Sequence, residues 1–547
     1  MIDLEREMLD CYFTRRCLSA AQLGLPGGLG RLPPVSDAQV DGLIGRYRAL
    51  AARIEAVPLD GLGDQDRLTA ALMAEICATE IDALALRTDR HCVSPLPEAG
   101  LASALLTFLP YAAVGSGEAA AAYVDTCELI PQALADYSEQ LARGRVAGRT
   151  PVARLVDRSV DQLRAYLSAP AGEDVFLAPL AGHPAARERL SGLLTDRIRP
   201  AFELLAEELS GPARGSARDD QHAGICHLPD GSADYRALLR EHTTLALDPI
   251  QVHRFGLERI GALTVEAVQI AERLGWSGDF AAVRDRLRGE GTLRFTDGAA
   301  MLRDATAAMD RAAGAVPEWI TDLPAARCEV RPMAATETAH GVIGHYETAP
   351  LDRSGPAVYW LNTADPTTRS SFEAEALAFH ESIPGHHIEI ATSQEAVRGS
   401  EFRRLVQVMP YTEGWALYAE RLADEMGLYS SDLDRLGMVS FDLWRSCRLV
   451  VDTGLHELGW SRSRAVDYLW EHTMLGRGNV VNEVDRYLAH PGSAPAYLVG
   501  RLTIERLRQA AGVSGRAQLR TFHDGLLRRG PLTLSLLGMT PGEIFAT

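Results

Sequence analysis

Three histidines and one glutamate fall within the eight residues from His380 to His387, in the stretch AFHESIPGHHIEIA. Apolar residues flank this group on both sides, so its polar side chains are expected to enter a buried environment. Buried imidazole and carboxylate groups need partners, and a divalent cation satisfies several of them at once. The stretch therefore predicts a metal site, and it limits how the chain around it can fold.

The order of these residues departs from that of a regular metal-binding helix. His380 and Glu381 begin the pattern H-E-x-x-H, in which two histidines one helical turn apart bind zinc and the glutamate activates water. Four residues after His380 stands Pro384, which cannot bind a metal, and the next imidazoles belong to His386 and His387. In an unbroken helix, a residue six positions on faces away, and one seven positions on lies roughly 10.5 Å along the axis. We therefore expect a bulge or break at the Pro-Gly pair that brings the second imidazole back to the metal.

Several stretches together resemble a known bacterial family. The pattern HExxPGHH, followed by EGWALYAE at residues 413–420, resembles the family called domain of unknown function 885 (DUF885). The resemblance runs from about residue 131 to near the C-terminus. It implies a fold similar to that of the zinc carboxypeptidases of the carboxypeptidase Taq type and, more distantly, to thimet oligopeptidase and angiotensin-converting enzyme. Three further stretches agree with it: LREHTTLALDP (239–249), RLVVDTGLHELGW (448–460) and VDRYLAHPGSAPAYLVG (484–500).

The resemblance also implies a set of metal ligands. Aligning the Gly-His of the carboxypeptidase Taq motif H-E-x-G-H with Gly385 and His386 makes His386 the second histidine ligand. His387 is then a neighbouring or substrate-binding group, and the reverse assignment stays open. The related gluzincins take their third ligand from a carboxylate on a later helix, and Glu413 begins such a helix here. Glu420 shares a helical face with Glu413, so it is a second candidate ligand or a carboxylate that orients a ligand histidine.

Two histidines and one carboxylate leave one coordination position open, which is typical of catalytic zinc. We therefore expect one Zn²⁺ ion, with other divalent metals as alternatives. Glu381 is expected to take a proton from the attacking water and pass it to the leaving amine. Related enzymes stabilise the oxyanion with a downstream tyrosine or histidine, and the candidates here are Tyr497 first, then His490 and His456.

Candidate substrate contacts lie on both sides of this motif. The segments RCEVRPM (327–333) and AVYWLN (357–362) carry β-branched or aromatic residues between turn-forming residues and predict two strands. Such a strand can pair with a substrate backbone, or the two can form a hairpin that only closes the lobe. Tyr359 in the second strand, His387 and Tyr487 are candidate substrate-binding residues. If the enzyme is a carboxypeptidase, Arg486 is the candidate partner of the terminal carboxylate.

The rest of the chain is helical in pattern. Residues 1–230 read as successive amphipathic helices with polar or Pro/Gly-rich joints, and predict an N-terminal helical lobe. Residues 231–547 predict a catalytic helical lobe with the short strands and the HExxPGHH site. We therefore predict a mainly α protein, a gluzincin-like helical metallopeptidase body with a small β-sheet beside the active-site cleft, in one continuous two-lobed body.

Composition excludes several other functions. The net charge of −18 argues against nucleic acids and anionic membranes as partners. All 55 basic residues are arginine, so lysine Schiff-base and P-loop chemistry are excluded. The first residues include acidic ones without a continuous apolar core, and no long apolar run follows, so we expect a cytoplasmic protein. The eight scattered cysteines form no C-x-x-C pair and are expected to be reduced.

The leading hypothesis is a zinc-dependent metallopeptidase that hydrolyses short peptides, with carboxypeptidase- or dipeptidase-like action. A second hypothesis is a metal-dependent hydrolase of a specialised amide in secondary metabolism. A third is a non-catalytic peptide-binding protein with the same fold. Glu381 argues against the third hypothesis, because a protein that only binds peptides needs no general base.

Overall fold

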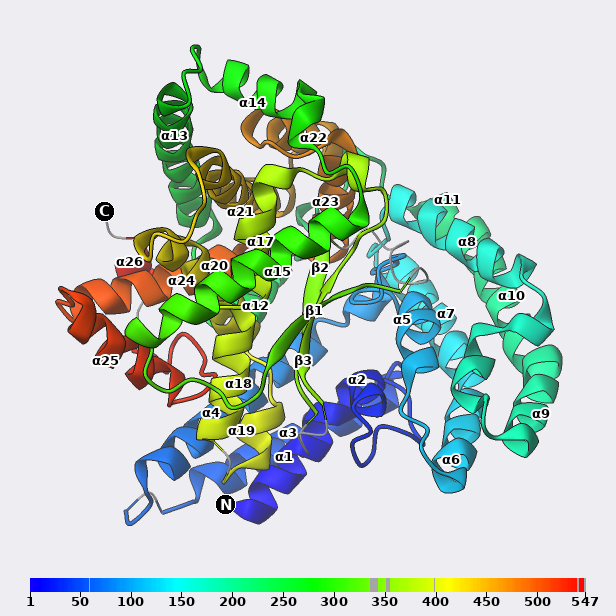
Figure 1. The fold of residues 1–547 in the computed structure, drawn as a ribbon. Helices are drawn as coiled ribbons and strands as arrows, with labels where there is room; N and C mark the ends of the chain where they lie inside the picture. The colour runs from blue at the N-terminus through cyan, green and yellow to red at the C-terminus, as the bar shows by residue number, and fades with distance from the viewer. Residues whose placement is uncertain (59, 335–342, 351–354, 398, 539–540, 546–547) are drawn as a thin grey trace. The chain divides into compact units, whose positions relative to one another are not determined.

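The computed structural model describes all residues except 59, 335–342, 351–354, 398, 539–540 and 546–547 (Figure 1). The described chain is mainly helical with one small sheet, which confirms the predicted fold class. It divides into two compact units. The first comprises Met1–Leu238, Leu455–Ala465 and Asn482–Pro491, and the second comprises Leu239–Gly454, Val466–Val481 and Gly492–Thr547. Within the described residues, no helix is both long and apolar enough to cross a lipid bilayer.

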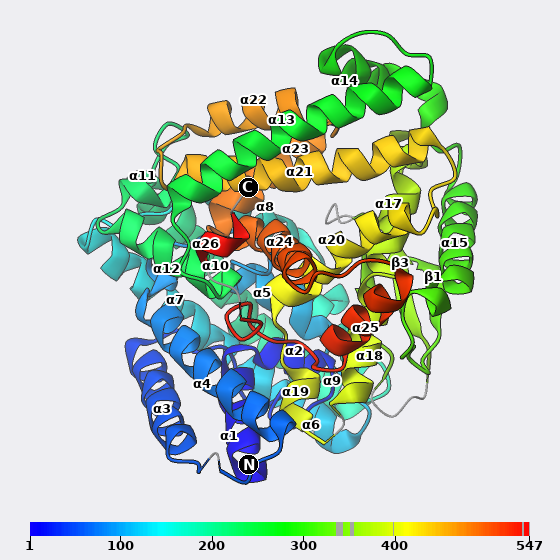
Figure 2. The same cartoon turned by 90° about the vertical axis from the view of Figure 1, so that its left-hand side faces the viewer.

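The first unit begins with a layer of long helices. Helix α3 (Asp37–Glu55) packs against both α1 (Ile2–Arg15) and α4 (Asp64–Ala85), and the three helices lie in the lower part of Figure 2. Ser36 caps α3, because its hydroxyl accepts a hydrogen bond from Gln39 N while the Gln39 side chain accepts one from Ser36 N. The turn chemistry of the sequence thus sets where this helix starts.

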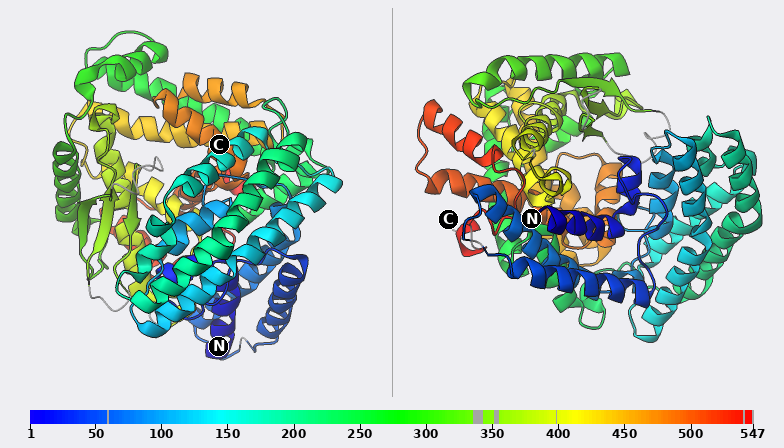
Figure 3. Two further views of the ribbon diagram at one scale, coloured as in Figure 1. Left: turned by 90° about the vertical axis from the view of Figure 1, so that its right-hand side faces the viewer. Right: turned by 90° about the horizontal axis from the view of Figure 1, so that it is seen from below.

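The remaining helices of the first unit enclose one apolar core. Helices α7, α8 and α10 pack side by side (Figure 3), around buried residues that include Leu134, Val156 and Phe202. The bounds of the helices that complete this part are α2 (Cys17–Gln22), α5 (Leu101–Phe108), α6 (Gly117–Glu128), α7 (Ile130–Val146), α8 (Ala153–Ser168), α9 (Pro184–Leu193), α10 (Arg199–Glu208) and α11 (Arg214–Ser216).

Buried polar side chains tie two later segments into the first unit. His456 Nδ1 accepts a hydrogen bond from Ile225 N at 3.2 Å, and His456 Nε2 donates to Tyr487 O at 3.0 Å. Asp485 is only 1% exposed, and it pairs with three arginines of the same unit: Arg154, Arg158 and Arg462. The contacts of His456 with Ile225 and of Asp485 with Arg154 and Arg158 join residues more than two hundred positions apart in the sequence, and periodicity alone does not reveal them.

Helices also make up most of the second unit. The long α13 (Pro249–Arg273) starts where Asp248 accepts a hydrogen bond from Ile250 N, and Pro249 occupies the first turn. Four further helices contain residues of both units: α12 (Gly231–Thr243), α21 (Asp432–His456), α22 (Arg462–His472) and α23 (Arg477–Ala489). The others are α14 (Phe280–Gly289), α15 (Gly298–Ala315), α17 (Ala374–Glu381), α18 (His386–Ala396), α19 (Glu401–Leu405), α20 (Met409–Glu425), α24 (Ser493–Ala510), α25 (Arg516–Leu527) and α26 (Pro541–Ile544).

A three-stranded sheet lies beside α15 and α17 in the second unit (Figure 1). Its order is β1 (Cys328–Pro332), β3 (Ala357–Leu361) and β2 (Gly344–Glu347). The two predicted strands are β1 and β3, and both are confirmed. They pair in parallel, so the hairpin alternative is wrong for them. The sequence analysis missed β2, which spans only four residues and pairs antiparallel with β3.

Candidate metal centre

The chain leaves the helical path between α17 and α18, at residues 382–385. Ser382 N and Ser382 Oγ both donate to Ala378 O, at 2.9 and 2.6 Å, and end the first helix. The connection contains a cis peptide bond at Ile383–Pro384. Helix α17 thus ends at Glu381 and α18 begins at His386. The predicted break in the motif is confirmed.

Close approach of the backbone explains the glycine in this connection. A Cβ atom at Gly385 would lie 2.0 Å from His380 O and 2.3 Å from Phe379 O. We attribute the glycine to this lack of space, because its φ of −77° is open to other residues. On the other side, the indole N–H of the fully buried Trp415 donates to Pro384 O at 2.9 Å. Helix α20 therefore holds the connection against the end of α17.

The break brings together the three predicted ligands. His380, His386 and Glu413 each offer one ligand atom within 4.8 Å of the others, from α17, α18 and α20 (Figure 1). Glu413 Oε2 lies 3.6 Å from His380 Nε2 and 3.9 Å from His386 Nε2. The two imidazole rings are nearly perpendicular, at 82°, with centroids 4.8 Å apart. We call these three side chains the ligand cluster.

Unpaired atoms test whether the ligand cluster suits a cation. In the part of the chain that the structure describes, Glu413 Oε2 and His386 Nδ1 are buried and have no hydrogen-bond partner. The distances from Glu413 Oε2 to the imidazole nitrogens exceed those of ordinary hydrogen bonds. A buried carboxylate oxygen without a partner is destabilising, and a cation held between it and two imidazoles removes that cost. Two nitrogen ligands and one oxygen ligand match the ligand set of catalytic zinc.

A second carboxylate orients the first histidine. His380 Nδ1 donates to Glu420 Oε1 at 2.8 Å, so its Nε2 faces the ligand cluster. Glu420 is only 2% exposed, and Arg445 Nη2 lies 3.5 Å from the same oxygen. Carboxylates that hold ligand histidines in this way fix the tautomer and the ring orientation. Glu420 thus has the position of an orienting group, and Arg445 is a supporting residue that the sequence analysis missed.

The charges of the ligand cluster reflect its burial. Burial lowers the pKa of His380, but Glu413 and Glu420 outweigh burial and raise it to about 9. Burial raises the pKa of Glu413, but His380 and His386 lower it to about 2. Burial lowers the pKa of His386 to about 4, and raises that of Glu381 to about 7. Without an ion, the cluster therefore keeps an ionised Glu413 close to a positive charge.

His387 points away from the ligand cluster. Its Nε2 lies 3.1 Å from Ala326 O, and its Nδ1 lies 3.2 Å from the hydroxyl of Tyr346. Tyr346 belongs to the missed strand β2, and its ring also lies over that of His386, with centroids 6.4 Å apart. Of the two neighbouring histidines, the structure thus brings only His386 to Glu413.

Tyr359 and Tyr497 lie on different elements of the second unit. The Tyr359 side chain on β3 is fully buried, and its hydroxyl has a pKa well above the usual range because of burial and the nearby charge of Glu381. The Tyr497 ring on α24 lies 4.5 Å from the guanidinium carbon of Arg448, a cation–π contact. Arg448 also contributes to the low pKa of Glu413. The sequence analysis did not assign a role to Arg448, although it begins one of the stretches that carry the family resemblance.

Four other candidates lie in the first unit. His456 uses both ring nitrogens for main-chain hydrogen bonds. Arg486 pairs with Glu483 through two contacts of 3.0 Å, and the Tyr487 hydroxyl donates to the same carboxylate at 2.7 Å. His490 N donates to Arg486 O at 3.0 Å. The catalytic and substrate-binding roles of these four residues stay predictions.

Comparison with known proteins identifies a family and two similar structures. Residues 18–539 match the sequence model of the family described as bacterial protein of unknown function (DUF885). The crystal structure of a putative lipoprotein from Colwellia psychrerythraea is similar over 99% of this chain and 98% of its own, with a TM-score of 0.88 and 22% identity. The structure of a putative lipoprotein of unknown function from Shewanella oneidensis is similar over 99% of this chain and 98% of its own, with a TM-score of 0.77 and 15% identity. No curated protein matches the chain. At these identities the two structures support the fold alone.

Proposed function

We propose that this chain, which belongs to the DUF885 family, is a zinc-dependent metallopeptidase that hydrolyses short peptides. The observation that carries the proposal is the convergence of His380, His386 and Glu413 within 4.8 Å, with Glu381 next to the first ligand. The HExxPGHH and EGWALYAE stretches resemble the DUF885 family, and the similarity that this resemblance implies to carboxypeptidase Taq-type enzymes supports the proposal. The proposed action is that of a carboxypeptidase or dipeptidase.

The ligand cluster would hold one zinc ion. When bound, the ion would polarise the carbonyl of the scissile bond and make water more acidic. Glu420 keeps the His380 ring turned so that Nε2 faces the ligand cluster. Trp415 holds the connection that returns His386 to the cluster.

Glu381 would act as the general base and then as the general acid. It would take a proton from water as the oxygen attacks the peptide carbonyl, and pass that proton to the leaving amine. Glu413 and His380 both act on its pKa, so its carboxylate lies within electrostatic range of the ligand cluster. Tyr497, with Arg448 over its ring, is our candidate for the group that stabilises the oxyanion.

Hydrolysis of short peptides by the zinc-loaded protein tests this proposal. Glu381→Gln is expected to lower turnover by about 10²–10⁴-fold, because glutamine keeps the shape of the side chain but cannot accept the proton. Its zinc content should equal that of the wild type. Glu401→Gln changes an exposed glutamate on α19 and should retain activity. Near-normal turnover by Glu381→Gln would rule out the proposed base.

The peptide panel also separates the kinds of cleavage. A carboxypeptidase needs a free C-terminus, so amidated peptides should resist it, while a dipeptidase should act on free dipeptides. Hydrolysis of small amides without peptide cleavage would support the alternative amide hydrolase. Peptide binding without turnover would support the alternative binding protein.

Cellular location is a separate prediction. The sequence predicts a cytoplasmic protein, whereas the two similar structures are described as putative lipoproteins. Fractionation of the producing cells decides between the two locations. Recovery in the soluble cytoplasmic fraction would support the prediction, and recovery with membranes would contradict it.

A further inference from the structure

A cavity of about 60 Å³ lies in the second unit beside α15, β3 and the first turns of α17. Most of its wall is apolar, and side chains from five separate segments contribute to it. The apolar residues that define its shape are Phe295, Met301, Ala305, Leu361, Leu377 and Phe441. Such mostly apolar pockets with a few polar groups are typical of ligand sites.

The cavity follows the face of α17 that leads to Glu381. Ala374 and Leu377 both line it. Leu377 and Glu381 are four residues apart on one helix, so their side chains occupy the same face one turn apart. Tyr359 lines the cavity from the sheet, and its hydroxyl is within electrostatic range of Glu381. The cavity therefore lies one helical turn from the proposed base.

A few polar side chains also line the cavity. The Tyr359 side chain is 0% exposed, and its hydroxyl has no hydrogen-bond partner in the part of the chain that the structure describes. Arg369, Ser370 and Glu373 also line the cavity. Glu373 Oε1 accepts a hydrogen bond from Ser440 Oγ at 2.6 Å. The buried Tyr359 hydroxyl is thus available for a polar atom of a ligand, while Glu373 is already engaged.

The volume limits the size of that ligand. A water-sized group needs roughly 10–15 Å³ of such space, so the cavity holds about 4–6 non-hydrogen atoms. Leucine, isoleucine and methionine side chains are of this size. A tryptophan or phenylalanine ring is larger, and a glycine residue leaves the space empty.

We propose that this cavity receives an aliphatic side chain of the peptide substrate beside the scissile bond, and selects residues of the size of leucine or methionine. The inference rests on the proposed function, because Glu381 and the ligand cluster define which bond is cleaved. The apolar wall supplies the affinity, and the Tyr359 hydroxyl is placed to bond a polar atom of the substrate backbone.

Two methionines of α15 provide a matched pair of variants. Met301 lines the cavity, whereas Met309, two turns later, is outside its described lining, and both are buried. Met301→Ala enlarges the cavity and should raise the kcat/KM for a phenylalanyl peptide relative to a leucyl peptide by about 10-fold or more. Met309→Ala should keep the wild-type ratio. Equal ratios in the two variants, with equal zinc content, would overturn the proposal.

Calorimetric titration of the metal-free protein gives a second measurement that does not depend on catalysis. The probes are the acetylated amides of leucine and glycine. The wild type and Met309→Ala should bind the leucyl probe about 10-fold or more tightly than the glycyl probe, because only leucine fills the apolar cavity. Ala305→Leu fills the cavity and should remove this preference. Met301→Ala serves in its place if Ala305→Leu does not fold, and should also reduce the preference.

The two measurements separate the two proposals. Absence of any peptide hydrolysis by the zinc-loaded wild type would overturn the proposed function. Absence of a preference for the leucyl probe in the metal-free wild type would overturn the cavity proposal, whatever the hydrolysis experiment gives.

Discussion

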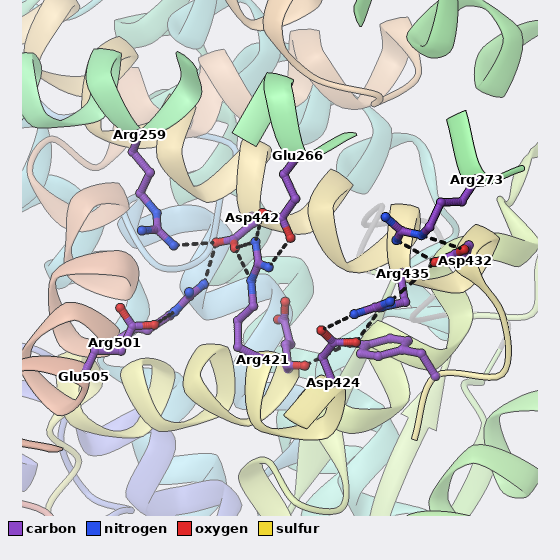
Figure 4. A network of polar contacts seen from close by, with 12 residues as sticks. Arg259, Glu266, Arg273, Arg421, Asp424, Asp432, Arg435, Asp442, Arg501 and Glu505 are labelled. Carbon is purple, nitrogen blue, oxygen red and sulfur yellow. Dashed lines mark hydrogen bonds and ion pairs between the residues drawn. The ribbon is translucent and has the colours of Figure 1, made fainter. Parts of the chain in front are cut away.

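Two buried polar clusters in the second unit share helix α20 but differ in how their charges are paired. The first is the ligand cluster. The second surrounds Asp442, which is 1% exposed and contacts three arginines (Figure 4). Arg501 Nη1 lies 2.5 Å from Asp442 Oδ1, Arg421 Nε lies 2.6 Å from Oδ2, and Arg259 is farther at 3.5 Å. We call this second group the arginine cluster.

The charges of the arginine cluster balance without any added ion, although Arg259 Nε is buried and has no hydrogen-bond partner among the described residues. Arg421 also pairs with Glu266, and Arg501 pairs with Glu505, so three guanidinium groups meet three carboxylates (Figure 4). Burial raises the pKa of Asp442, but the arginines outweigh burial and hold it well below its usual range. These pairs join α13, α20, α21 and α24. The cluster therefore contributes to the fold.

Pairing in the ligand cluster is looser, because Glu413 Oε2 lies 3.6 Å from the Nε2 atom of His380 and 3.9 Å from that of His386. Its Glu413 Oε2 lacks a hydrogen-bond partner among the described residues, and its neighbours are two imidazoles. Glu420 and Arg421 are adjacent in sequence, yet the first supports the ligand cluster and the second belongs to the arginine cluster. The two groups on α20 thus differ in charge pairing: the arginine cluster holds short ion pairs, whereas the ligand cluster leaves a carboxylate oxygen beyond hydrogen-bond distance of its neighbours. Our proposal that the ligand cluster binds an ion uses this difference.

The ligand cluster can be broken without touching a ligand. Gly385→Ala places a Cβ 2.0 Å from His380 O, so the connection must move and His386 must move with it. We expect the zinc affinity of this variant to fall as much as if one of the ligand side chains had been removed. Competition with a chelator measures this affinity. The control is Gly399→Ala, because a Cβ there meets no atom within 4 Å. Equal zinc affinities in the two variants would contradict the role given to the break.

A substitution in the arginine cluster should lower the stability of the fold and leave zinc binding unchanged. Asp442→Ala removes the buried carboxylate that three guanidinium groups share, one of them buried and two partly exposed, so we expect a loss of about 3–5 kcal/mol in the free energy of unfolding of the second unit. Denaturant titration measures this loss, and zinc stoichiometry in the folded variant should be unchanged. Asp432→Ala removes a more exposed pair with Arg273 and should cost about 1 kcal/mol or less. Similar losses of unfolding free energy in the two variants would contradict the view that the buried arginine cluster stabilises the fold more than an exposed ion pair does.

Glu420 should produce the smallest effect of the three. Glu420→Gln keeps the size of the side chain but weakens its bond to His380 Nδ1, so the ring is less firmly oriented. We expect zinc affinity to fall by about 10–100-fold. The matched control is Glu425→Gln, which lies on the same helix and loses only its pairing with Arg508. If zinc affinity falls no further in Glu420→Gln than in Glu425→Gln, then Glu420 only stabilises the fold and does not orient His380 for the metal.

The structural features that the sequence predicted and the structure shows are those with a local signal. Pro384 stands where a regular helix would need a ligand, and this position predicts both the break and the return of the second imidazole. The alternation of apolar and turn-forming residues predicts β1 and β3. Glu413 entered the prediction through the family resemblance, and the structure places it beside His380 and His386.

The features that the sequence did not predict depend on contacts between residues that are far apart in the chain. Glu420 and Glu413 share a helical face, and only the bond to His380 distinguishes an orienting carboxylate from a ligand. Asp442 meets arginines from three other helices, and no spacing in the sequence records that meeting. His456 resembles a catalytic histidine in the sequence, but its two ring nitrogens bond main-chain groups of the first unit.

Metal analysis of protein purified without chelators tests the central claim most directly. The wild type should contain one zinc ion per chain, and His380→Ala should contain none while its circular dichroism stays unchanged, because a helical body of this size does not depend on the ion. His387→Ala should keep the zinc, because that side chain bonds Ala326 O and Tyr346 instead. A wild type that takes up no zinc, or a His380→Ala variant that binds it as tightly as the wild type, would contradict the account.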